Sequence, residues 1–68
     1  MKKKSVVLFG HATSVSLENE FWQALQDIAD NRQTSVSALI AQIDENRTTN
    51  LSSAIRVFIL KQLQNSKN

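Results

Sequence analysis

The chain has 68 residues and a formal net charge of +2, with 41% hydrophobic and 21% charged residues, one glycine, one histidine, no proline and no cysteine. This composition is typical of a compact helical domain and not of a disordered segment. The lack of cysteine excludes disulfides and thiolate metal sites, and with a single histidine we expect no metal, no cofactor and no enzyme activity. A chain this short usually needs an oligomer to complete its core.

Charge is distributed unevenly along the chain. All six acidic residues lie between Glu18 and Glu45. The charged residues of the segments before and after them, 1–17 and 47–68, are all basic. Two basic ends indicate a surface that faces a polyanion, and nucleic acid is the leading candidate. A lysine cluster at a terminus is equally typical of a solvated tail, and residues 1–4 are interpreted as a basic arm.

The apolar runs are short. The longest, residues 6–9 and 57–60, cannot cross a bilayer. We therefore expect no membrane partner and a cytoplasmic location.

Residues 5–17 are predicted to form β structure. Residues 5–9 are an apolar, β-prone run, and Gly10 then interrupts it, as at a bulge or tight turn. The chain either continues, kinked, into the next strand or folds back as a hairpin around Gly10, and the pattern is compatible with both. From residue 11 onward, side chains alternate between two faces. The face to be buried holds Thr13, Val15 and Leu17, and the outward face holds Ala12, Ser14 and Ser16.

Three helices are predicted after the strand, over residues 18–32, 35–46 and 51–64. Apolar residues recur at helical spacing in each, and Thr34 or Ser35 is expected to cap the second helix. In the third helix Val57 and Leu60 widen the apolar arc, which suggests burial against more than one neighbour, as at a dimer interface. Near the end of the second helix, the Asp44–Glu45 pair followed by Arg47 is interpreted as a solvated face or a local ion pair, in preference to a metal or acid-base site.

Several separated motifs resemble one family. A strand that passes directly into a helix, a turn at residues 31–35 and a second helix opening at Ser35 resemble the ribbon-helix-helix fold of the Arc/MetJ class of bacterial repressors. More narrowly, the segments 10–18, 21–22, 43–44 and 50–54 resemble short bacterial ribbon-helix-helix proteins with an extra C-terminal helix. The similarity extends from about Ser5 to Leu63.

This resemblance implies a mainly α domain whose N-terminal strand pairs across a homodimer, with a third, C-terminal helix. It also implies a transcriptional regulator that inserts a two-stranded β-ribbon into the DNA major groove. Carried over position by position, the base-facing residues are Ala12, Ser14 and Ser16. The residues expected at the DNA backbone are Ser35, Val36 and Ser37 from the resemblance, and Lys2, Lys3, Lys4 and His11 from their charge or position. The dimer core is expected to include Val15, Leu17, Trp22, Leu25 and Ile40.

The outward row also suggests an alternative. Ribbon readers usually carry Arg, Lys, Gln or Asn there, whereas Ala12 and two serines offer one methyl contact and hydroxyl bonds to several bases. Specific readout then needs other groups or DNA shape. The alternative function is a dimeric protein-protein interaction module on the same scaffold, with a second protein bound through the C-terminal helix.

Overall fold

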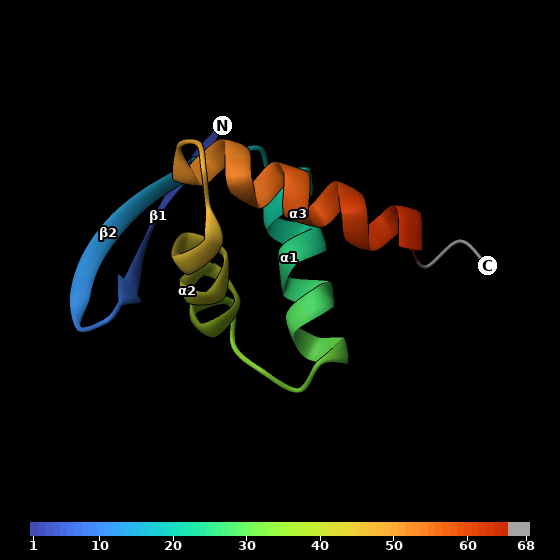
Figure 1. The fold of residues 1–68 in the computed structure, drawn as a ribbon, viewed down its shortest axis with the longest axis horizontal. Helices are drawn as coiled ribbons and strands as arrows, with labels where there is room; N and C mark the ends of the chain where they lie inside the picture. The colour runs from blue at the N-terminus through green and yellow to red at the C-terminus, as the bar shows by residue number, and fades with distance from the viewer. Residues whose placement is uncertain (66–68) are drawn as a thin grey trace.

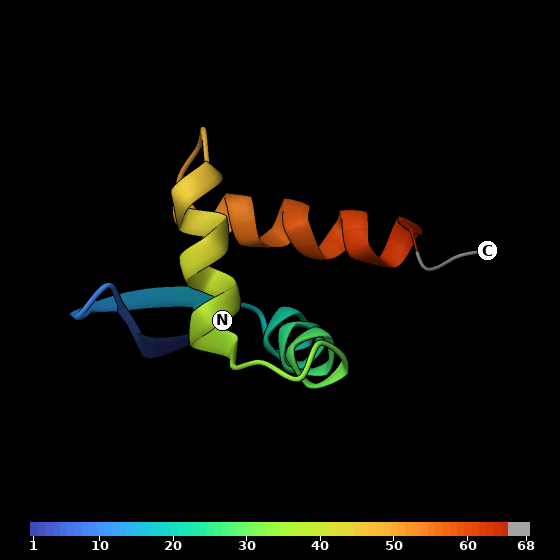
Figure 2. The ribbon, with the colours of Figure 1, turned by 60° about the horizontal axis from the view of Figure 1, so that its bottom comes forward.

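The computed structural model describes residues 1–65 and contains a two-stranded antiparallel sheet followed by three helices (Figure 1). The elements are β1 (Lys2–Leu8), β2 (His11–Leu17), α1 (Asn19–Asn31), α2 (Val36–Asn46) and α3 (Leu51–Asn65). The sheet lies at one end of the molecule with α2 packed beside it, and α3 crosses α1 and extends beyond it (Figures 1 and 2).

The two strands form a hairpin, which decides between the alternatives left open for residues 5–9. Leu8 pairs with His11, and Lys2 pairs with Leu17 at the open end. Phe9 and Gly10 make the turn with φ values of 53° and 81°. Positive φ at both central residues is the signature of a type I′ turn, whose twist matches that of the flanking strands. Glycine supplies this conformation without steric penalty at the second position.

Residues 1–4 are not a free arm, because β1 begins at Lys2. Two interactions fix this end of the strand. The Trp22 Nε1–H donates to the Lys2 carbonyl oxygen at 2.9 Å, and the Lys4 ammonium lies 5.1 Å from the centroid of the Trp22 ring. The prediction of a free basic arm was therefore wrong, because the backbone of all three lysines is paired with β2 as part of the hairpin.

One apolar core lies beneath the hairpin and between the helices. The five residues predicted for the dimer core are already buried within the single chain. The strands contribute their inward side chains and each helix its apolar stripe, and the full set is Val6, Leu8, Val15, Leu17, Trp22, Leu25, Ala29, Leu39, Ile40, Ile43, Ile55 and Ile59. This core fixes which face of the hairpin remains outside.

Candidate nucleic-acid interface

The outer face of the hairpin is built by strand alternation. Because Val6, Leu8, Val15 and Leu17 point into the core, the residues between them point outward. The register sets them in cross-strand pairs, namely Lys3 with Ser16, Ser5 with Ser14, and Val7 with Ala12. We call these six residues the outer face. They are exposed except for Ser16, which is half-buried, and no acidic residue is among them.

The sequence-based prediction found only one strand of this face. It placed Ala12, Ser14 and Ser16 there, and the structure adds Lys3, Ser5 and Val7 from β1. The sequence contained no alternation signal for β1, since Lys2–Leu8 has four polar residues followed by three apolar ones. Of the three lysines, only Lys3 shares the outer face.

Lys2 and Lys4 lie elsewhere, beside the start of α2. Both line an open hollow of about 390 Å³ together with Trp22 and Val36. The sequence predicted two groups of contacts to the DNA backbone, the lysines and the first turn of the second helix. These two groups are therefore neighbours in space. A positive charge and a helix N-terminus both favour an anion at this place.

Ser35 defines that helix start. Its backbone is extended (φ −95°, ψ 157°), and its Oγ accepts a hydrogen bond from the Ala38 N–H at 3.1 Å. The predicted serine cap is thus confirmed. Ala38 is the third residue of the helix, so the cap satisfies the third backbone N–H group. The N–H groups of the first two residues, Val36 and Ser37, have no acceptor within an α-helix. These N–H groups are the ones that a phosphate oxygen can accept from.

His11 is not part of this cluster. The register places it next to the turn, at the opposite end of the hairpin from Lys2–Lys4. It is exposed and lines a different hollow, of about 510 Å³, together with Ser14 of β2, Asp44 of α2 and Arg47 of the loop after α2. Arg47 there bonds Asp44 at 2.6 Å, which confirms the predicted local ion pair.

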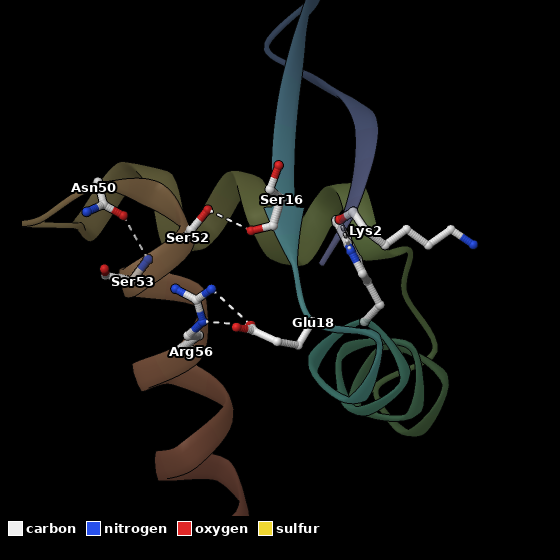
Figure 3. Close-up of polar contacts among 8 residues, drawn as sticks. Lys2, Ser16, Glu18, Asn50, Ser52, Ser53 and Arg56 are labelled. Carbon is white, nitrogen blue, oxygen red and sulfur yellow. Dashed lines mark hydrogen bonds and ion pairs between the residues drawn. The ribbon is translucent and has the colours of Figure 1, made fainter.

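The junction between β2 and α1 is held by α3 (Figure 3). Ser52 Oγ donates to the Ser16 carbonyl oxygen at 3.1 Å. Arg56 donates through Nε and Nη2 to Glu18 Oε1, at 3.1 and 2.9 Å. At the start of α3, Asn50 Oδ1 accepts from the Ser53 N–H at 2.9 Å and so caps the helix. The contacts to Ser16 and Glu18 fix the direction in which the chain leaves β2 and enters α1.

The contacts of α3 also contribute to a lowered pKa at Glu18. A backbone hydrogen bond at Glu18 itself and the hydrogen bonds from Arg56 lower the pKa of this carboxyl group, although desolvation opposes them. Sequence reasoning missed this pair because Glu18 and Arg56 are 38 positions apart. No local pattern connects residues at that separation.

The described residues show no other obvious site. Among residues 1–65, no three His, Cys, Asp or Glu side chains are grouped so that they could hold a metal ion. None of the described helices is long and apolar enough to cross a membrane.

Comparison with known proteins gives one match. The family model of the ribbon-helix-helix domain matches residues 1–63. No curated protein and no solved structure gives a significant match.

Proposed function

This chain belongs to the ribbon-helix-helix family, and from that premise we propose that it is a small, cytoplasmic, dimeric DNA-binding repressor that places the outer face of its hairpin in the major groove. Members of the family are typically DNA-binding transcription regulators that act as dimers. The observation that supports the proposal most strongly is the outer face itself, which is exposed, free of acidic residues and fixed in register by the core beneath it.

The hairpin has suitable dimensions and chemistry for this role. The major groove, about 12 Å wide, admits a two-stranded β-ribbon, and β1 and β2 form such a ribbon within one chain. Lys3 can donate to guanine O6 and N7, and the serine hydroxyls can bond several bases. Val7 and Ala12 can contact a thymine methyl group. The outer face therefore has one strong base-reading side chain, and we propose that DNA shape supplies part of the specificity.

We propose that the backbone contacts come from the anion-favouring cluster beside the hairpin. The N–H groups of Val36 and Ser37 would bond a phosphate, as the resemblance implies, and Lys2 and Lys4 would add charge next to them. The hollow that Lys2, Lys4 and Val36 line supports this assignment, because it places the two lysines and the first residue of α2 beside the same open space. Phosphate contacts of this kind position the ribbon but do not read sequence.

A salt titration of DNA binding tests the proposal. Binding of the full chain to a fluorescently labelled random duplex is followed by anisotropy at increasing salt. We expect the logarithm of the affinity to fall linearly with the logarithm of salt concentration, by about 0.9 for each phosphate neutralised. Replacing Lys2, Lys3 and Lys4 with Ala should flatten this slope. No binding even at low salt would contradict the proposed function.

A further inference from the structure

Lys4 starts from the inner face of the hairpin, the face that otherwise supplies the core. It pairs with Val15 in the register, and Val6 and Leu8, at the alternate positions after it, are buried. A lysine is almost never fully buried, because an unpaired ammonium is costly to remove from water. Lys4 accordingly remains exposed, and its ammonium lies 5.1 Å from the centroid of the Trp22 ring. The ring is thus the apolar surface against which this lysine lies.

The Trp22 ring is itself held in one orientation. Its side chain packs in the core and is 6% exposed, and its Nε1–H donates to the Lys2 carbonyl oxygen at 2.9 Å. Because an indole side chain has only two torsions, burial and one directed hydrogen bond leave it little freedom. A fixed ring offers a cation a defined place, since the ring face attracts an ammonium within about 6 Å.

An aromatic ring holds a cation without cancelling its charge. Arg47 and Arg56 each bond a carboxylate, and Arg32 is held over another ring at the opposite end of α1. None of the ion pairs formed by residues 1–65 includes Lys4. Because an ammonium has three N–H donors, one side of Lys4 can lie on the ring while another donates to a phosphate oxygen.

The carboxylates of the neighbouring helix do not neutralise Lys4. The hollow that Lys4 and Trp22 line contains no acidic residue, and its other lining residues are Lys2, Asn19, Gln23, Gln26 and Val36. Asp27 and Asp30, further along α1, accept hydrogen bonds from two of these glutamines at 3.2 and 2.9 Å. Glu18 bonds Arg56, and Glu20 forms no ion pair within the described part of the chain. The charge of Lys4 therefore remains available to an external anion.

We propose that Trp22 is a positioning residue for DNA binding, which holds the Lys4 ammonium ready for a phosphate of the duplex. This inference rests on the proposed function and adds to it a residue that acts through Lys4. A free lysine side chain loses rotamer freedom when it binds a phosphate, and this loss reduces affinity. When the ring already restricts Lys4 in the unbound protein, the loss on binding is smaller.

The single tryptophan of the chain allows a test that leaves the shape of the core nearly unchanged. Tryptophan with one, two or three fluorine atoms on its benzo ring is incorporated biosynthetically at this one position. Each fluorine withdraws electron density from the ring face and weakens its attraction for a cation, while the Nε1–H donor is kept. We expect the affinity of the full chain for a random duplex at low salt to fall stepwise, by about twofold to fivefold in total.

Two lysine variants assign this effect to Lys4. In Lys4→Gln the affinity for DNA should no longer change with fluorination, because the cation over the ring is absent. Lys61→Gln removes the same charge from an exposed position on α3 and should keep the full stepwise response. Thermal unfolding of each fluorinated protein, followed by circular dichroism, checks that the fold is retained.

Three outcomes overturn the inference. An affinity that does not change with fluorination means that Trp22 does not position Lys4 for DNA. A rise in affinity means that the ring competes with the phosphate for the ammonium. An equal response in Lys4→Gln means that fluorine acts through the fold. All three leave the proposed function standing, whereas a lack of DNA binding by the unmodified chain at low salt removes both.

Discussion

The ion pair between Glu18 and Arg56 joins the start of α1 to α3, since Glu18 immediately precedes α1 and Arg56 lies in α3. The pKa of Glu18 is lowered in the folded chain. A carboxyl group of this kind adds stability that is fully present above its ordinary pKa, and the added stability is lost as pH falls through the lowered value. Both side chains are partly exposed, at 30% for Arg56 and 43% for Glu18, so solvent screening keeps the effect small.

Glu18→Gln should therefore change the pH dependence of stability. We expect the difference in the free energy of unfolding between the natural chain and the variant to be constant near neutral pH and to shrink as the solution is acidified through the folded pKa. Urea unfolding at a series of pH values measures this difference. Arg56→Gln should show the same trend, because it breaks the same pair. Parallel stability curves for the natural chain and Glu18→Gln would rule out the proposed linkage.

At the scale of single residues, prediction from sequence succeeded where the interaction is local. The Ser35 cap and the Asp44–Arg47 pair join residues three positions apart, a distance fixed by helix geometry. The bond from Ser52 to Ser16 joins residues 36 positions apart. Its partners depend on how α3 crosses the rest of the chain, which no local pattern specifies.

The hairpin is the element on which the proposed function depends. Its turn contains a conflict, because Phe9 adopts φ 53° at a position where Asn or Gly is preferred, whereas Gly10 adopts φ 81° at no cost. A side chain at position 10 would meet no atom within 4 Å, so only the backbone conformation matters there.

Substitutions in this turn should have opposite signs. Phe9→Asn should stabilise the chain by about 1 kcal/mol, since Asn tolerates left-handed backbone better than Phe. Gly10→Ala should destabilise it by about 1 kcal/mol for the converse reason. Thermal unfolding monitored by circular dichroism measures both changes. Equal and small effects would mean that the turn does not hold its type I′ conformation in solution.

At the scale of elements, the helices and β2 followed from periodicity, whereas β1 was only half recognised. The apolar part of β1 was predicted, but three consecutive lysines suggested a free tail. The structure shows instead that these lysines alternate across the sheet, with Lys3 on the outer face and Lys4 over Trp22. An ordered strand with charged residues is compatible with the general use of lysine on edge strands.

At the scale of the whole molecule, the hairpin lies at one end and α3 extends away from it beyond α1 (Figure 2). Sequence reasoning predicted the fold family correctly, and the family match over residues 1–63 confirms it. How copies associate depends on surfaces whose partners are not encoded in local periodicity.

We propose that the outer face of the hairpin contacts DNA, and a comparison of two variants tests this contact. Ser14→Asp places a carboxylate in the middle of that face, and Thr48→Asp makes the same charge change in the exposed loop between α2 and α3. We expect Ser14→Asp to weaken binding to duplex DNA at least about tenfold, because like charges facing each other are strongly unfavourable. Thr48→Asp should change the affinity less than about twofold. Equal affinities for the two variants would contradict the claim.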